Sequence, residues 1–277
     1  MASAPFSWIK PEPHGIYIPP ADCWVDPSRA VDRALVTHGH ADHARGGHGQ
    51  TVATPETLAI MELRYATRDG ATPVEYGETI RLPGGVDATY IPAGHVLGSA
   101  QILLEHAGER VIVTGDYKRR PDPTCPPFEV TACDIFITEA TFGLPVFCHP
   151  PIEEEMKKLL DRLADHPDRC VLIGAYALGK AQRVIAELRR AGHTRPIYLH
   201  GAMEKMCRLY EEHGIDLGEL RLVADATKDE MRGHIVVSPP SALNDRWSRR
   251  LPEPITAMAS GWMRVRQRAR QRNVELP

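Results

Sequence analysis

The sequence of 277 residues contains no apolar stretch that approaches the roughly 20 residues needed to cross a bilayer. No basic segment followed by a short apolar segment opens the chain, as a secretory leader would. Internal repeats and low-complexity tracts are also absent. These absences exclude transmembrane and repeat architectures, and we expect a globular, cytoplasmic protein without a membrane partner.

Paired cysteines and an excess of positive charge are missing as well. The six cysteines include no Cys-x-x-Cys pair, so we expect buried reduced thiols instead of disulfides or a thiolate zinc site. The net charge of −3 and the isoelectric point near 6.5 argue against a uniformly basic surface. A local basic patch that binds phosphates is still compatible with this composition.

The pattern of apolar residues divides the chain into two regions. Residues 15 to 114 contain mainly short segments that alternate apolar and polar residues, which is typical of sheets with one covered face. One helix is expected near residues 55 to 65, with Thr54 as its N-cap. From about Pro150, amphipathic helices alternate with apolar strands, which predicts a parallel-sheet unit inserted into the first region.

The internal segment THGHADHARGGHG, residues 37 to 49, contains four histidines and one aspartate. Alternate residues of an extended segment project to one side, so His38, His40 and Asp42 can converge on one point. A helical turn after them can bring His43 back to the same place. Because imidazole and carboxylate are ligands that zinc, manganese and iron accept, this spacing predicts a metal site.

Three further segments place candidate ligands at the ends of predicted strands. His95 follows an apolar strand and lies beside Gly94, whose missing side chain permits a close approach. Asp116 and Asp26 each follow a strand directly. Taken alone, each has an ordinary explanation as a core histidine or a turn-capping aspartate. The histidine-rich segment favours the functional interpretation, because its metal would need more ligands.

These residues can be assembled into a site for two metal ions. The ligands would be His38, His40 and His95 for one ion, Asp42 and His43 for the other, and Asp116 as a bridge. Two such ions can lower the pKa of a bridging water toward neutrality and stabilise both oxygens of an in-line displacement at phosphorus. Zinc is the expected ion, and manganese is an alternative because carboxylates contribute. Hydrolysis is the chemistry that this arrangement favours.

At these positions the sequence resembles the metallo-β-lactamase superfamily, whose hallmark H-x-H-x-D-H is present from His38 to His43. Asp26, His95 and Asp116 keep the order of the family's other early motifs. TEATFG, which contains Glu139, resembles the β-CASP branch of nucleic-acid nucleases, as do YALGKAQRV, IYLHGAMEKM and MASGWM. The segment HGIYIPPADCWVDPSRAVDRALVTHGHADHARGG is most similar to the bacterial ligase-associated DNA exonucleases.

The resemblance covers essentially the whole chain and implies an α/β fold, an αββα metallo-β-lactamase sandwich with an inserted β-CASP α/β cap domain. The implied boundaries are residues 1–145 for the metallo-β-lactamase core, 146–254 for the β-CASP domain and 255–277 for the return to the core. The resemblance also implies catalytic roles for Asp42 and Glu139, and structural support of the site by Asp26. By the same analogy, Glu139 would orient a catalytic histidine.

The chain departs from the family's pattern after MASGWM. The family continues to an Asp-His-Ala-Asp-like motif, whose histidine completes the coordination of the second ion. A later Thr-His-Gly-like motif supplies a histidine for acid catalysis or transition-state stabilisation. This sequence ends at Pro277 and offers no substitute after Trp262. The interpretations left open are a fragment of a longer nuclease, a truncated gene product and an inactive relative.

Two strand-to-helix junctions are candidate substrate contacts. Gly179 and Lys180 open a predicted helix, where free backbone N–H groups and a cation can meet a phosphate. Ser260 and Gly261 follow a predicted strand in a similar way. A groove that follows a nucleic-acid backbone would also suit the arginine-rich stretch that comprises Arg246, Arg249, Arg250, Arg264, Arg266, Arg268, Arg270 and Arg272. Two tryptophans in this part of the sequence, Trp247 and Trp262, suit base stacking, but core packing is the expectation for each.

The residues and the resemblance together favour metal-dependent hydrolysis of phosphodiester bonds in DNA, starting from an end. One alternative is an RNA-processing nuclease of the same fold, because recognition of a 2′-hydroxyl cannot be read from the sequence. The other is an inactive nucleic-acid-binding or scaffold protein. DNA is the favoured partner, and the resemblance adds DNA ligase and helicase repair proteins as expected protein partners.

Overall fold

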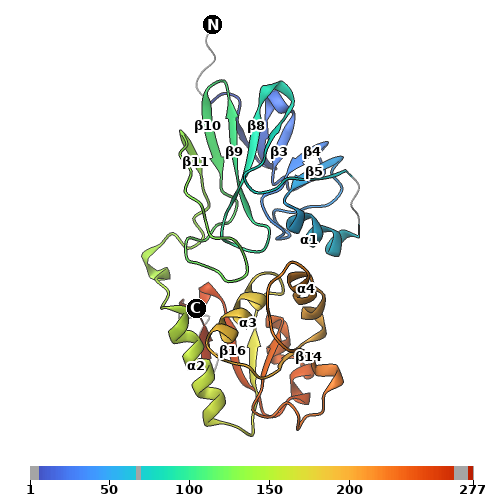
Figure 1. The fold of residues 1–277 in the computed structure, drawn as a ribbon, viewed down its shortest axis with the longest axis vertical. Coiled ribbons are helices and arrows are strands. Elements are labelled where there is room, and N and C mark those ends of the chain that lie inside the picture. The colour runs from blue at the N-terminus through green and yellow to red at the C-terminus, as the bar shows by residue number, and fades with distance from the viewer. Residues whose placement is uncertain (1–5, 67–69, 265–273, 277) are drawn as a thin grey trace. The chain divides into compact units, whose positions relative to one another are not determined.

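The structure of the protein is a computed structural model that describes residues 6–66, 70–264 and 274–276. It divides into two compact units, Met1–Glu139 and Ala140–Pro277, and each unit has its own sheets (Figure 1). The mixed α/β class that the sequence predicted is confirmed. Within the described ranges, no helix combines the length and the apolar character required to span a membrane.

Two sheets form the first unit. The first sheet is antiparallel from β1 to β3 and parallel from β3 to β6. In spatial order its strands are β1 (Lys10–Glu12), β2 (Gly15–Ile18), β3 (Cys23–Val25), β4 (Arg33–Leu35), β5 (Gln50–Ala53) and β6 (Ala71–Pro73). The second sheet is antiparallel except for the pair β10 and β11, and β8, β9 and β10 run side by side in Figure 1. In spatial order its strands are β11 (Ile135–Ile137), β10 (Glu109–Val113), β9 (Ala100–His106), β8 (Asp87–Pro92) and β7 (Thr79–Arg81).

A shared hydrophobic core joins these two sheets. Leu35 of β4 lies in one cluster of buried residues with Tyr90 of β8 and Ile102 of β9. Successive residues of a strand point to opposite faces. Accordingly, Ala34 belongs to a separate cluster on the other face of the first sheet, together with Met61 of helix α1. The first sheet is therefore covered on both faces around β4, the strand that leads into the histidine-rich segment.

Helix α1 (Pro55–Tyr65) begins as the sequence predicted, because the Thr54 side chain accepts a hydrogen bond from the backbone N–H of Thr57 at 3.2 Å. The hydroxyls of Thr54 and Thr57 both donate to the carbonyl oxygen of Gly98, at 2.7 and 2.9 Å. These two hydrogen bonds tie the start of α1 to the loop that carries His95. The helix thus covers one sheet and also positions a candidate ligand loop of the other.

A six-stranded sheet forms the second unit, and all its neighbouring strands are parallel, as predicted. In spatial order the strands are β14 (Leu220–Leu222), β13 (Ile197–Leu199), β15 (Ile235–Ser238), β12 (Val171–Gly174), β16 (Ile255–Ala259) and β17 (Val274–Leu276). The helices are α2 (Ile152–Asp165), α3 (Lys180–Arg190), which links β12 to β13, and α4 (Gly201–Glu212), which links β13 to β14. Helix α2 packs on β12, and α4 packs on β13 and β15.

The observed units differ from the expected boundaries in two places. The first unit ends at Glu139, whereas the expected core extended to residue 145. Residues 255–277 were expected to return to that core, but Ile255–Ala259 pairs with β12 inside the sheet of the second unit. An apolar run of this length predicts a strand, but it does not specify which sheet the strand joins, because pairing is decided by distant residues.

Candidate metal centre

The histidine-rich segment starts where β4 ends, and Asp26 holds its first residue in place. The backbone N–H of Thr37 donates to Asp26 Oδ1 at 2.8 Å, and the Thr37 hydroxyl donates to Asp26 Oδ2 at 2.6 Å. The next side chain, His38, is completely buried, and its Nδ1 lies 3.0 Å from the Thr37 hydroxyl oxygen. This contact leaves Nε2 of His38 directed toward the other imidazoles.

Four side chains converge at one point: His38, His40, His95 and Asp116 each place one ligand atom within 4.8 Å of the others. His40 Nδ1 lies 3.0 Å from His38 Nε2 and 3.2 Å from His95 Nε2. Asp116 Oδ2 lies 3.9 Å from His38 Nε2 and 3.5 Å from His95 Nε2. The other oxygen of this carboxylate therefore remains available to a second group.

His43 is that second group. Its Nε2 lies 3.5 Å from Asp116 Oδ1, and its Nδ1 lies 2.7 Å from Asp26 Oδ2. Asp116 thus faces His38 and His95 through one oxygen and His43 through the other. Asp42 lies at the margin, with its Oδ2 3.9 Å from His43 Nε2 and 79% of its side chain exposed. Asp42 is outside the group of four, contrary to the expectation of convergence with His38 and His40.

The loop that carries His95 is shaped by glycine and serine. Gly94 has a φ of +71°, and a Cβ there would lie 2.4 Å from the carbonyl oxygen of Lys118. A larger residue would therefore force the loop away from its neighbour. The Ser99 hydroxyl accepts the backbone N–H groups of His95 and Val96 at 3.0 and 3.1 Å. Ser99 is a supporting residue that the sequence did not single out.

Asp116 follows β10 through another tight glycine. Gly115 has a φ of +55°, and a Cβ there would lie 2.4 Å from the Thr37 hydroxyl oxygen. This close approach brings the end of β10 against the residue that precedes His38. Thr37 is a second supporting residue that the sequence reasoning missed, although its position between the β4 strand and the first histidine was a usable signal. Its hydroxyl contacts both Asp26 and His38.

The electrostatics of the group favour metal binding by neutral imidazoles. Burial, together with the neighbouring imidazoles, holds the pKa of His38 well below its ordinary value. Burial and His40 lower the pKa of His95 to about 3, although Asp116 opposes them. The hydrogen bond from His43 holds the pKa of Asp116 below its usual range. Two imidazoles are thus unprotonated and one carboxylate is ionised at neutral pH, which is the form that coordinates a cation.

The pKa of His43 is raised, in contrast to the lowered pKa values of His38 and His95. Burial lowers its pKa, but the hydrogen bonds with Asp116 and Asp26 outweigh burial and raise the pKa to about 10. Because Asp26 accepts at Nδ1, His43 presents Nε2 to the site, and a carboxylate behind a histidine in this way commonly fixes the orientation of a metal ligand. Three imidazoles, a carboxylate and a carboxylate-backed fourth imidazole fit a divalent cation such as zinc in donor type.

Glu139 follows β11 at the same sheet edge as Asp116. The strands β10 and β11 are parallel neighbours in which Val113 pairs with Ile137, so the residues after them emerge side by side. Glu139 is half-buried and lies outside the group of four.

The predicted substrate contacts lie in the second unit. The backbone N–H of Gly179 donates to Gln182 Oε1 at 2.9 Å, and that of Lys180 donates to Leu178 O at 3.1 Å. Both amides were expected to be free, and both instead have hydrogen-bond partners within the chain. Ser260 is buried and its hydroxyl accepts the backbone N–H of Trp262 at 3.3 Å. Within the arginine-rich stretch, Arg266, Arg268, Arg270 and Arg272 lie outside the described residues.

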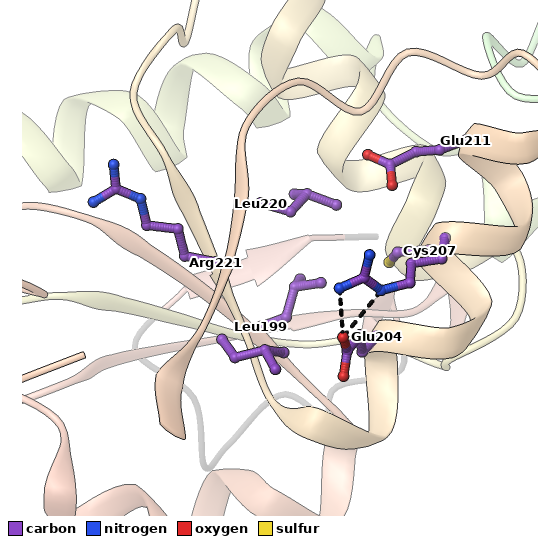
Figure 2. A pocket seen from close by; sticks show the side chains of 8 residues that line it. Leu199, Glu204, Cys207, Glu211, Leu220 and Arg221 are labelled. Atoms are coloured by element: carbon purple, nitrogen blue, oxygen red, sulfur yellow. Dashed lines mark hydrogen bonds and ion pairs between the residues drawn. The ribbon is translucent and has the colours of Figure 1, made fainter. Parts of the chain in front are cut away.

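The second unit also contains a small hollow of about 100 Å³ between α4 and the edge strand β14. Figure 2 shows Glu204, Cys207 and Glu211 on the α4 side and Leu220 and Arg221 on the strand side. Arg208, which also lines the hollow, donates to Glu204 at 2.7 Å, and Arg221 lies 2.5 Å from Glu219. Both arginines therefore have acidic partners.

Comparison with known proteins defines the class of this chain. It is 33% identical over 261 residues to a probable DNA ligase of Opitutus terrae, covering 92% of this chain and 25% of that protein. It is 30% identical over 211 residues to ribonuclease TTHA0252 of Thermus thermophilus, covering 63% of this chain and 47% of that protein. Other relatives are named as endoribonucleases. The chain thus spans between a quarter and a half of the length of these two relatives.

A solved structure of a protein of unknown function from Enterococcus faecalis V583 shares the fold, with a TM-score of 0.53 and 12% identity over 88% of this chain and 68% of the other. No protein-family model matches the sequence. The motifs, the two-unit α/β architecture and the nuclease relatives agree with one another. The chain belongs to the β-CASP branch of the metallo-β-lactamase superfamily.

Proposed function

We propose that the protein is a metal-dependent hydrolase of phosphodiester bonds that acts on DNA and removes nucleotides from an end. The observation that supports this most directly is the convergence of His38, His40, His95 and Asp116 within 4.8 Å. Nuclease relatives narrow the reaction from hydrolysis in general to hydrolysis of a nucleic acid.

The proposed cofactor is a pair of divalent cations, most simply Zn²⁺, with Mn²⁺ as the alternative. His38, His40 and His95 would hold one ion, and His43 with Asp42 the other. When bound, such ions polarise a phosphoryl oxygen and lower the pKa of water toward neutrality. Asp116 has one oxygen facing each group of ligands, which suits a bridging position.

The surrounding residues keep the ligands ready for this role. Asp26 accepts the Nδ1 proton of His43, so that Nε2 faces Asp116. The burial of His38 keeps its imidazole neutral, as its depressed pKa indicates. Asp42, largely exposed, and Glu139, half-buried, are proposed to contact the reacting groups when substrate is present. Lys180 and Ser260 are proposed contacts for substrate phosphates, with Gly179 and Gly261 as the glycines beside them.

DNA is the preferred substrate because the relative that covers 92% of this chain is named as a probable DNA ligase. A module of this kind within a ligase chain would act on DNA ends, and the DNA ligase or a repair helicase is the proposed partner. RNA is the second candidate substrate, since several relatives are named as ribonucleases or endoribonucleases. A cytoplasmic location is proposed with this role.

The test is a hydrolysis assay with the full chain and defined metals. End-labelled single-stranded DNA, duplex DNA and RNA are incubated with protein that has been stripped with a chelator and then reloaded with Zn²⁺ or Mn²⁺. The proposal expects release of mononucleotides from DNA, loss of release in His40→Ala, and normal release in Asp87→Asn, a control at a surface ion pair with Arg81. Faster cleavage of RNA than of DNA would identify RNA as the substrate. Binding of all three without cleavage would contradict an enzymatic role.

A further inference from the structure

Aromatic rings gather beyond the carboxyl end of β16, in the second unit. The Trp262 ring centroid lies 5.4 Å from that of Phe142 and 5.5 Å from that of Phe147. Phe142 also lies 5.0 Å from Phe147 and 5.9 Å from His149. The planes of these pairs are inclined by 57° to 87°, so the rings brace one another edge to face. We refer to these four residues as the aromatic cluster.

The cluster faces solvent although it is made of large apolar rings. Phe142 is 42% exposed and Trp262 is 37% exposed. The short helix η7 (Gly261–Arg264) explains why Trp262 points outward: the adjacent Met263 is buried in the core of the unit and takes the inward position. Core packing was the expectation for both tryptophans: Trp247 packs against this core, whereas Trp262 is exposed.

The backbone under the cluster is fixed by hydrogen bonds. The N–H groups of Trp262 and Met263 donate to the hydroxyl and the carbonyl oxygen of Ser260, at 3.3 and 2.9 Å. Gly261 leaves room for a neighbouring ring, because a Cβ at this position would lie 2.8 Å from Cζ of Phe142. The cluster is therefore a preformed surface, which limits the entropy lost when a ligand binds.

Its place in the fold is where parallel sheets bind ligands. In open α/β sheets, ligands bind beyond the carboxyl ends of the strands. β12 and β16 are parallel neighbours in which Gly174 pairs with Met258, so the residues that follow them leave the sheet at the same edge. Tyr176, which is 55% exposed, and Lys180 at the start of α3 follow β12 there. This edge of the sheet therefore combines exposed aromatic rings with a cation.

We propose that the aromatic cluster stacks against the bases of single-stranded nucleic acid. This inference rests on the proposed function, because the family membership makes nucleic acid the ligand to expect. Every base has a π-face, so aromatic side chains bind single strands with little dependence on sequence. In a duplex the bases are already stacked on one another, and the cluster therefore favours a single-stranded end over a paired one.

The experiment measures binding without cleavage. The full chain is stripped of metal with a chelator, and its affinity for a fluorescein-labelled oligonucleotide of 10 deoxythymidines, about the footprint of an oligonucleotide-binding domain, is measured by anisotropy. The same strand without bases serves as the matched ligand. Trp262→Ala and Phe142→Ala are expected to weaken binding of the base-containing strand by about tenfold, within the range of base stacking. Binding of the abasic strand is expected to stay unchanged.

Three further variants separate stacking from loss of structure. Trp262→Phe, which keeps a ring, is expected to restore most of the affinity. Gly261→Ala is expected to weaken binding by displacing the Phe142 ring. Leu144→Ala, which removes an exposed aliphatic side chain on the segment that carries Phe142, is expected to bind normally. Because stacking releases no counterions, the slope of log Kd against log salt concentration should be equal in Trp262→Ala and the wild type.

The results separate this inference from the proposed function. Equal affinities of Trp262→Ala, Phe142→Ala and the wild type for the base-containing strand would overturn the inference, as would an equal loss on the abasic strand. If the base-dependent loss appears while metal-loaded protein hydrolyses nothing, the cluster binds nucleic acid and the proposed enzyme activity fails. If hydrolysis occurs and both variants bind like the wild type, the activity stands and the stacking role fails.

Discussion

Asp26→Asn replaces one carboxylate oxygen by an NH₂ group at a residue that contacts His43. The hydrogen bonds of Asp26 indicate how this substitution affects metal binding. In the wild type, Asp26 Oδ1 accepts the Thr37 N–H at 2.8 Å, and the amide oxygen of asparagine can keep this bond. Oδ2, which lies 2.7 Å from His43 Nδ1, becomes an NH₂ group that only donates. His43 Nδ1 must then accept, which moves the imidazole proton to Nε2. In the wild type Asp26 keeps the remaining proton on Nδ1 when a metal ion displaces the one on Nε2, whereas in Asp26→Asn the remaining proton is held on Nε2, the nitrogen that would bind the metal.

The size of the effect follows from the lost charge. A hydrogen bond to a charged group contributes about 1.5–3 kcal/mol, and replacing a carboxylate behind a metal-bound histidine typically costs about 10–100-fold in metal affinity. The loss should fall on the ion that His43 is proposed to hold, while the ion proposed for His38, His40 and His95 should remain. Titration of metal-free protein with Zn²⁺ against a fluorescent chelator should show one of two sites weakened in Asp26→Asn.

The protonation state of His43 provides a second measurement on the same substitution. Asp116 and Asp26 raise its pKa to about 10 against the effect of burial, so NMR of the metal-free protein should show His43 protonated at neutral pH. Its ion pairs stabilise the fold fully below the unfolded pKa of about 6.5, and this contribution is lost as the pH rises toward 10. The stability difference between wild type and Asp26→Asn should therefore narrow over that range. Unchanged zinc binding with an unchanged His43 pKa in Asp26→Asn would refute the reasoning.

Three further tests address the fold, one beside the site and two in the second unit. Gly98→Ala should lower the free energy of unfolding by about 2 kcal/mol or more, because φ is +76° and the new Cβ would lie 2.6 Å from the Thr57 nitrogen. The control is Gly108→Ala, where φ is +84° but the space around the new Cβ is open. This control should lower the free energy of unfolding, measured in urea, by only about 1 kcal/mol. Leu172→Ala, in the core of the second unit, should cost about 2–5 kcal/mol by the same method, and a cost below 1 kcal/mol would contradict the packing. A thiol reagent at pH 8 should modify the exposed Cys148 first, and mass spectrometry showing preferential labelling of a buried cysteine would contradict the structure.

Local patterns in the sequence predicted the parts of the structure that local physics decides. The helix Pro55–Tyr65 and its N-cap at Thr54 appear where residue propensity placed them. The alternation of His38 and His40 likewise indicated that their side chains meet, and their ring nitrogens lie 3.0 Å apart. Such features depend on residues a few positions apart, whose relative directions are set by the backbone conformation.

Features that depend on turns or on distant pairing were not predicted. Asp42 was expected to continue the alternation, but the chain turns at His40, where the N–H of Ala44 donates to the His40 carbonyl at 2.7 Å. This turn leaves the Asp42 side chain largely exposed. The amide of Gly179 was expected to be free, but Gln182 reaches back and caps it. In each case a hydrogen bond to a nearby residue competed with the expected role, and side-chain spacing alone gives no sign of it.

The central claim is that this arrangement of histidines and aspartates binds divalent metal, and zinc analysis of the full chain tests it most directly. After saturation with Zn²⁺ and removal of the excess, mass spectrometry of the metal content should give about two ions per chain, and X-ray absorption should show imidazole nitrogens at about 2.0–2.1 Å. His40→Ala should lose at least one ion. A wild-type chain that retains no zinc, or that binds it equally well as His40→Ala, would contradict the account.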